Sequence, residues 1–242
     1  IEGNPWTMLA ADNRLFVVTE DSQILCFGPS NENPKKHSPV ETPLPQPGNP
    51  SNAQVQAILK HLQDTAGHAL CLGVKIETLD GLLKETNLRI VAVGADETAV
   101  DSLRRRYQAA GLYGHRISVH HHDDPTQFPA PPHFANLVIV EGEATKDISP
   151  QKLSSVYQST RPYGGILCLY SKLSPLNHDT KALPKAVVLE KSPNALIVKK
   201  EGALPDTADW SHQYGDAGQS VVSKDNKVKA PLGLLWFGGP SN

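Results

Sequence analysis

Residues 89–119 decide the fold, and they read RIVAVGADETAVDSLRRRYQAAGLYGHRISV. The apolar run at 90–93 predicts a strand that is buried on both faces. Residues 97–110 then carry apolar side chains at the spacing of a helix, and the run at 117–119 predicts a second strand. A strand, a helix and another strand in this order indicate parallel strands with a helix packed on the sheet.

The same alternation continues on both sides of this stretch. Upstream, apolar residues at helical spacing from Val55 to Leu62 predict a helix that ends near Gly67. Downstream, residues 186–189 and 195–198 are expected to pair as a closing antiparallel hairpin. Further strands are expected at 69–72, 137–140 and 166–170, and further helices near 77–86 and 150–159. The prediction is an α/β fold with a doubly wound, mainly parallel sheet.

The two ends of the chain differ from this middle part. Residues 1–28 alternate between short apolar runs and polar turns, which predicts a three-stranded β-meander with turns at 12–13 and 21–22. Pro, Asn and Ser dominate the next segment, which suits an extended linker, and the last part of the chain is β-like again. The expected organisation is a β segment at 1–28, a linker at 29–51, an α/β domain at 52–200 and a second β segment at 201–242.

Composition excludes several classes of function. The chain has 242 residues, with 23 Lys and Arg against 25 Asp and Glu, so it has no large field of one sign and we expect no nucleic-acid partner. Its apolar runs are far shorter than the roughly 20 residues that cross a bilayer, so no membrane span is expected. Cys26, Cys71 and Cys168 lie far apart in the sequence, which favours buried thiols over a disulfide framework or a zinc site.

Three motifs of the middle part resemble class I S-adenosylmethionine methyltransferases. They are LCLG at 70–73, VAVGAD at 91–96 and RPYGG at 161–165. In that family the loop after the first strand approaches the cofactor, and an acid at the end of the second strand binds the ribose. The resemblance implies S-adenosylmethionine as the cofactor, with Gly73 and Asp96 beside it and Asp123 towards the adenine amine.

The loop after the fourth strand contains the candidate catalytic residue. It reads VEGE at 140–143. Methyl transfer depends mainly on aligning the acceptor with the methyl group. Some small-molecule methyltransferases carry an acid in this loop, so the resemblance implies that Glu141 acts as a base towards a hydroxyl or an amine. An exposed acid at a strand end, without a catalytic role, is the competing interpretation.

The cofactor loop departs from the family pattern. Where the family carries G-x-G-x-G, this chain reads GVKIE at 73–77, so Lys75 and Glu77 replace two glycines and crowd the cofactor path. The second strand ends at Gly94, and the nearest carboxylate is that of Asp96. Two functions remain: a degenerate, non-catalytic domain used for interaction or scaffolding, which we favour, and an active S-adenosylmethionine-dependent methyltransferase of unknown acceptor.

The flanks resemble a second family, the quinoprotein-type β-propellers with pyrroloquinoline quinone-like repeats. The similar segments are RLFVVTEDSQILCF at 14–27, ADWSHQY at 208–214 and PLGLLWF at 231–237. The resemblance implies that the α/β domain is inserted in a larger β-propeller chain, the remainder of which is its partner. The sequence leaves the compartment unknown, but the resemblance implies an exported or periplasmic protein. Residues 1–3 contain no start Met, so we expect that either processing or excision of a fragment has removed the natural beginning, and the propeller resemblance favours an excised piece of a larger chain.

A run of three histidines and two aspartates at 120–124 has the side chains of a metal site. Strand alternation places His120 and His122 on one face and His121 on the other, so a closed site would need a further ligand from elsewhere. We therefore expect no metal, and a strand end that leads into a polar loop.

Overall fold

The computed structural model describes residues 3–29, 43, 49–146, 148–171 and 179–227, and only the backbone of 49–52. The chain divides into two compact units, residues 1–40 and 41–242, and each unit contains one sheet. The division falls within the proline-rich segment at 29–51.

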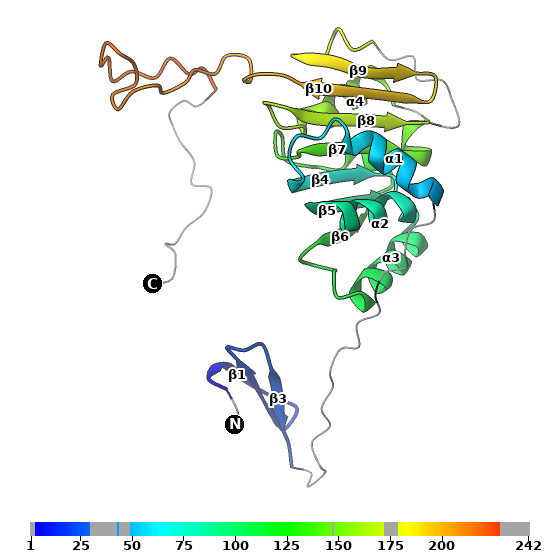
Figure 1. Cartoon of the computed structure of the whole chain (residues 1–242). Helices are drawn as coiled ribbons and strands as arrows, with labels where there is room; N and C mark the ends of the chain where they lie inside the picture. Colours follow the sequence, from blue (N-terminus) through cyan, green and yellow to red (C-terminus); the bar gives the residue numbers. More distant parts are fainter. Residues whose placement is uncertain (1–2, 30–42, 44–48, 147, 172–178, 228–242) are drawn as a thin grey trace. The chain divides into compact units, whose positions relative to one another are not determined.

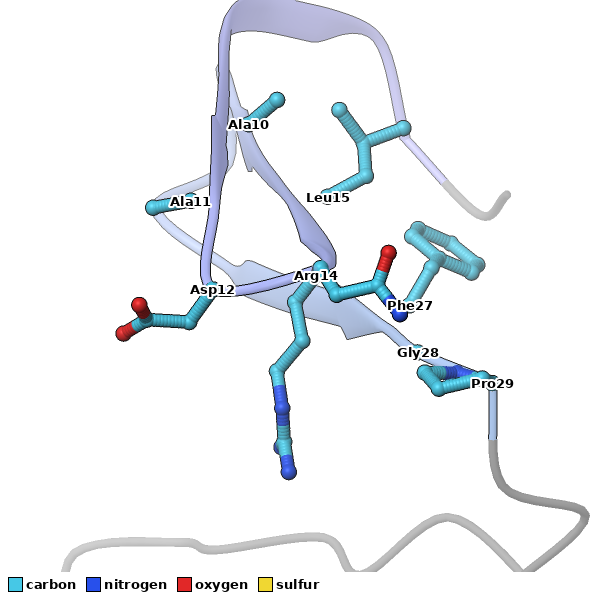
Figure 2. A pocket seen from close by; sticks show the side chains of 9 residues that line it. Ala10, Ala11, Asp12, Arg14, Leu15, Phe27, Gly28 and Pro29 are labelled. Carbon is cyan, nitrogen blue, oxygen red and sulfur yellow. The ribbon is translucent and has the colours of Figure 1, made fainter.

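The first unit is an antiparallel sheet in the order β1 (Pro5–Ala11), β2 (Arg14–Thr19) and β3 (Ile24–Phe27), as the β-meander prediction requires. Asp12 and Asn13 have φ angles of 47° and 57° and form the two-residue loop between β1 and β2. Positive φ at both positions is typical of a type I′ turn, which Asp and Asn favour. Figure 2 shows the hollow beside this turn, where the Asp12 and Arg14 side chains point away from each other.

β1 is the exposed edge of this small sheet. All seven of its residues are exposed, including Trp6, Met8 and Leu9. On β2, by contrast, Val17 and Thr19 are buried. Within residues 3–29, Val17 is the only buried apolar residue, so this sheet has no ordinary core of its own.

The second unit contains four α-helices and seven strands within its described residues, and none of these helices is both long and apolar enough to cross a membrane. The helices are α1 (Asn49–Leu59), α2 (Ile76–Glu85), α3 (Glu97–Ala109) and α4 (Pro150–Gln158). The strands are β4 (Ala66–Leu72), β5 (Asn87–Gly94), β6 (Ile117–His121), β7 (Leu137–Glu141), β8 (Gly165–Tyr170), β9 (Ala186–Ser192) and β10 (Ala195–Lys200). Two short 3-10 helices follow strands, η1 (Pro125–Gln127) and η2 (Gly142–Thr145).

The seven strands form one mixed sheet in the order β6-β5-β4-β7-β8-β10-β9 (Figure 1). The five strands from β6 to β8 are parallel, and β10 pairs antiparallel with both β8 and β9. The predicted α/β class, the mainly parallel sheet and the closing hairpin are therefore confirmed.

Both faces of the sheet are covered by helices. On one face α1, α2 and α3 bury apolar side chains against the strands, among them Ile58, Leu82 and Leu103. On the other face α4 packs with Leu153 and Val156. This is the doubly wound arrangement, and its polar groups are left at the strand ends, where a ligand site can form.

The first helix ends earlier than the sequence predicts. α1 stops at Leu59 instead of near Gly67, and β4 already begins at Ala66. The side chain of Asn136 holds this extension of β4, because its Nδ2 donates to the carbonyl of Ala66 at 2.9 Å and its Oδ1 accepts from the amide of His68 at 3.2 Å.

The C-terminal segment does not form the β structure that the sequence predicts, as far as it is described. Residues 201–227 contain one isolated bridge, between His212 and Gly215, and no strand. Several amides bond to nearby carboxylates instead, for example those of Gly218 and Ser220 to Asp216. Asx-type bonds of this kind satisfy a backbone that has no partner strand. The predicted strand at 231–237 lies outside the described residues.

The junction between β4 and β7 requires a glycine. Gly73 follows β4 with a φ of 86°, and a Cβ atom there would lie 2.1 Å from the backbone oxygen of Glu141. No side chain fits at that distance, so the strand ends can approach this closely only because residue 73 lacks a Cβ atom.

We predict that Gly73→Ala lowers the free energy of unfolding by more than about 3 kcal/mol, because backbone strain and the clash with Glu141 add together. Gly114→Ala is the matched control, since Gly114 also has a positive φ of 89° but open space where the Cβ would lie. The left-handed conformation alone should cost about 1–2 kcal/mol there. Urea denaturation of both variants measures the difference, and equal losses would contradict the role of the close contact.

Candidate functional site

The carboxyl ends of β4, β5, β6 and β7 border a cavity of about 580 Å³. β4 has β5 on one side and β7 on the other, and ligands of open α/β sheets bind where the strand order reverses in this way. The volume lies in the range of ~300–1,000 Å³ that is usual for small-molecule sites. The lining residues are Gly73, Val74, Lys75, Gly94, Ala95, Asp96, Ala99, Asp123, Asp124, Pro125, Glu141, Gly142, Glu143, Ala144 and Lys152.

All four residues that the sequence singles out border this cavity. Gly73 follows β4, Asp96 follows β5, Asp123 follows β6 and Glu141 ends β7. Parallel strands present their carboxyl ends at one edge of a sheet, which is why residues so far apart in the sequence come together.

Asp96 is held at the cavity by the helix that it begins. It is the N-cap of α3, and its Oδ1 accepts a hydrogen bond from the amide of Ala99 at 3.1 Å. A capping carboxylate of this kind has a fixed position. Although Asp96 comes two residues after Gly94, its exposed side chain therefore lies beside the cavity at the start of α3.

The two aspartates after β6 have different environments. The side chain of Asp123 is fully exposed and lies 3.8 Å from Nε2 of His121. Asp124 accepts hydrogen bonds from Thr126 and Gln127 and pairs with Lys152 at 2.7 Å. Partial burial would raise the pKa of Asp124, but these bonds outweigh it and hold that pKa below its ordinary value. Asp124 is thus a structural residue, and Asp123 has the carboxylate that a ligand can reach.

Glu141 is fully buried, with 0% of its surface exposed. Its Oε2 accepts hydrogen bonds from Gln54 and Thr78, both at 3.0 Å, and lies 3.6 Å from Nζ of Lys75. Its Oε1 is buried and has no hydrogen-bond partner among the described residues. The carboxylate therefore joins α1, α2, the loop after β4 and the end of β7, and it borders the cavity without being open to it.

Burial shifts the pKa of Glu141 and of the neighbouring Cys71. Burial raises the pKa of this carboxyl group, although the bonds from Gln54 and Thr78 and the charge of Lys75 lower it in part. The pKa of Cys71 is raised by its burial first, and then by electrostatic interaction with Glu141 and with Cys168.

The three cysteines are free thiols. Cys71 and Cys168 are buried and Cys26 is exposed, so the described part of the chain contains no disulfide.

The loop after β4 is filled by side chains. Val74 packs against Gly94, where a Cβ would come within 2.8 Å of Val74 Cγ2. Lys75 lies along the cavity wall with its Cε about 4.0 Å from the Cβ position of Gly142. Glu77 is exposed in the first turn of α2 and does not line the cavity. Of the two residues expected to crowd the cofactor path, Lys75 therefore lines the cavity and Glu77 does not, because Glu77 is exposed on the first turn of α2.

The histidine run follows strand alternation, as predicted. His120 and His122 both contact the ring of Phe128, at centroid distances of 5.5 and 6.2 Å, while Nε2 of His121 lies 3.1 Å from the carbonyl of Ala95. Across the described ranges, no group of three or more His, Cys, Asp or Glu side chains is arranged to hold a metal ion.

Three residues of the site were missed from the sequence. Gln54 lies on α1 and Thr78 on α2, and both bond to Glu141. Lys152 lies in the first turn of α4 and pairs with Asp124. Each occupies a polar position within an amphipathic helix, where a solvent-exposed role is the usual interpretation. Only the strand ends carried a sequence signal, because their position follows from the topology.

No model of a protein family matches the sequence, and no curated protein matches it. Among solved structures, the chain is similar to a candidate S-adenosyl-L-methionine-dependent methyltransferase from Methanococcus maripaludis, with 13% identity and a TM-score of 0.52 over 64% of this chain and 87% of the other. It is also similar to geranyl diphosphate C-methyltransferase from Streptomyces coelicolor, with 12% identity and a TM-score of 0.43 over 49% of this chain and 42% of that one.

The first of these similarities establishes the fold. The mixed α/β unit with its seven-stranded, mostly parallel sheet is a methyltransferase-like domain of class I type. At 13% identity the likeness concerns the fold alone. Activity must be argued from the site.

We predict that Glu141→Gln gains stability relative to the native chain as the pH rises from about 4, where a free glutamate begins to ionise. The pKa of Glu141 is raised in the folded state, so the folded chain binds this proton more tightly than the unfolded chain does. Stability is then highest below the unfolded pKa and falls as the pH rises through the folded pKa, and the amide variant lacks this loss.

Chemical denaturation of both chains at several pH values measures this difference. Glu143→Gln is the control, because that side chain is 73% exposed and pairs with Lys146 at the surface. A difference that does not change with pH, or one that changes in the opposite direction, would contradict a raised pKa at Glu141.

Proposed function

We propose that this domain is a degenerate, non-catalytic methyltransferase-like module that serves interaction or scaffolding within a larger quinoprotein-like β-propeller protein. The observation that carries the proposal is the burial of Glu141, whose carboxylate pairs with the partly exposed Lys75. The two side chains lie between the loop after β4 and the end of β7. In the methyltransferase family the first of these segments contacts the cofactor through its backbone, and the second presents a group to the methyl acceptor.

The burial and hydrogen bonds of Glu141 argue against the role of base that the resemblance implied for it. A general base must come within hydrogen-bond distance of the proton that it takes. Glu141 has no exposed surface, and its Oε2 already accepts from Gln54 and Thr78. Its carboxylate would have to leave these partners to meet an acceptor in the cavity, which would leave the Lys75 charge without its partner.

The first unit supports the view that the domain belongs to a larger β protein. β1 exposes Trp6, Met8 and Leu9 on a strand edge that has no further neighbour among the described residues. Natural sheets usually cover or charge such edges. Additional strands from the remainder of a propeller would cover this one, and an exported or periplasmic location follows from the same resemblance.

An active S-adenosylmethionine-dependent methyltransferase is the second candidate, and the cavity favours it. The cavity has a suitable volume at the reversal of strand order, and Asp96 and Asp123 present carboxylates to it. Asp96 would bind the ribose hydroxyls and Asp123 the adenine amine. Exposed carboxylates also attract a cationic ligand such as a sulfonium.

We expect calorimetric titration of the chain with S-adenosylmethionine and S-adenosylhomocysteine to give no binding up to about 1 mM, a limit near −4 kcal/mol. The reason is that the Lys75 side chain, held by Glu141, covers the backbone of the loop after β4 that the cofactor would contact. If binding is observed, two variants show whether the ligand occupies this cavity. Asp96→Asn removes the carboxylate but keeps the helix cap, since Asn caps as well as Asp, and Glu97→Gln changes the neighbouring acid as a control.

Micromolar binding that is weakened at least tenfold by Asp96→Asn and unchanged by Glu97→Gln would overturn the degenerate site and favour the enzyme. Methyl transfer to any acceptor by the native chain would do the same.

A further inference from the structure

A second cavity, of about 330 Å³, lies at the other end of the strands from the methyltransferase-like site. Lys200, which lines it, ends β10 and pairs with Gly165, the first residue of β8. This is the amino end of the parallel strands, whereas the methyltransferase-like site lies at their carboxyl ends. The lining residues come from α4, β10 and nearby loops: His133, Ser154, Tyr157, Gln158, Pro184, Lys200, Leu204, Pro205 and Lys227.

Lys200 has an unusual position for an ammonium group. The residue is only 4% exposed, and no carboxylate pairs with it in the described part of the chain. Its Nζ donates to the carbonyl of Thr160 at 2.9 Å, just beyond the C-terminal end of α4, and lies 4.6 Å from the centre of the Tyr157 ring. Carbonyls at a helix end and an aromatic face stabilise a cation, but they supply only partial charges.

Two further residues with basic side chains line the cavity, His133 and Lys227. His133 Nδ1 lies 3.4 Å from Lys200 Nζ, and Lys227 lines the same cavity. Burial lowers the pKa of His133, and so do the charges of Lys200 on β10 and Lys227 in the C-terminal segment. None of the described lining residues is acidic. Burial also lowers the pKa of Lys200, and an anion bound beside these groups would stabilise their charged forms.

The rest of the cavity wall is mainly apolar. Pro184, Leu204 and Pro205 line it together with the Tyr157 ring, whose hydroxyl donates to the carbonyl of Pro184 at 2.9 Å and is thereby held in place. A ligand that fits must therefore carry an apolar body in addition to its charge.

We propose that this cavity binds a small organic oxyanion, a carboxylate or phosphate ester with an aromatic or aliphatic body. The oxyanion lies between Lys200, His133 and Lys227, in place of the long contact of 3.4 Å between Lys200 and His133. The apolar body packs against Tyr157 and Leu204. This site is separate from the methyltransferase-like cavity and does not depend on the function proposed for it.

The test is a titration of the 242-residue chain with phenyl phosphate, with benzoate and with inorganic phosphate, in which NMR follows the His133 ring. We expect a saturable shift with at least one aromatic anion, a Kd below about 1 mM and a rise in the pKa of His133, because the anion places a negative charge beside the ring. Inorganic phosphate should bind at least tenfold more weakly. The two aromatic anions distinguish a phosphate site from a carboxylate site.

Substitutions test which lysine binds the anion. Lys200→Met keeps the length and apolar stem of the side chain and should raise the Kd at least tenfold. Lys199→Met is the control, because Lys199 precedes it on β10 and pairs with Glu201 at the surface. Should Lys200→Met fail to fold, Lys227→Gln makes the same comparison on an exposed lysine, with Lys224→Gln as its control.

Three results would overturn the proposal. They are the absence of a saturable shift with either aromatic anion at about 10 mM, an equal loss of binding in a variant and its control, and inorganic phosphate binding as tightly as phenyl phosphate, which indicates an adventitious ion only.

Discussion

The buried carboxylate of Glu141 is the interaction on which the α/β unit most depends. It ends β7, and it accepts hydrogen bonds from α1 through Gln54 and from α2 through Thr78. A buried polar group is costly to leave without partners, so these hydrogen bonds and the nearby Lys75 tie the two helices and the loop after β4 to the end of β7. The backbone of Glu141 has a second role, because its close contact with Gly73 holds the end of β7 against the end of β4.

The two ends of the sheet therefore differ in charge. At the carboxyl ends, five carboxylates and two lysines line the cavity, and both lysines are already paired with acids of that lining, Lys75 with Glu141 and Lys152 with Asp124. At the amino ends, Lys200 and His133 lie in a lining that contains no acid among the described residues. One end thus favours a cationic ligand and the other an anionic one, although a single sheet carries both.

The sequence predicted the α/β fold because buried strands such as 90–93 are continuous apolar runs with amphipathic helices between them. The resemblance to class I methyltransferases indicated four residues at strand ends, and the parallel topology brings all four to one cavity. The sequence could not predict the partners of Glu141, because Thr78 and Gln54 are 63 and 87 residues away and only side-chain packing selects them. The side-chain direction of Glu77 and the lack of strands at 201–227 were not predicted for a similar reason, because the direction of a helical side chain and the presence of a partner strand are tertiary properties.

The strand order also affects how the chain folds as it leaves the ribosome. β4 is the first strand of the large sheet to be made, yet it lies near the middle, with β5 and β7 as neighbours. β5 follows after one short helix, whereas β7 begins only at Leu137. A nascent chain that ends before Leu137 therefore leaves one edge of β4 unpaired, and such an edge can pair with other chains until the second half of the sheet is synthesised.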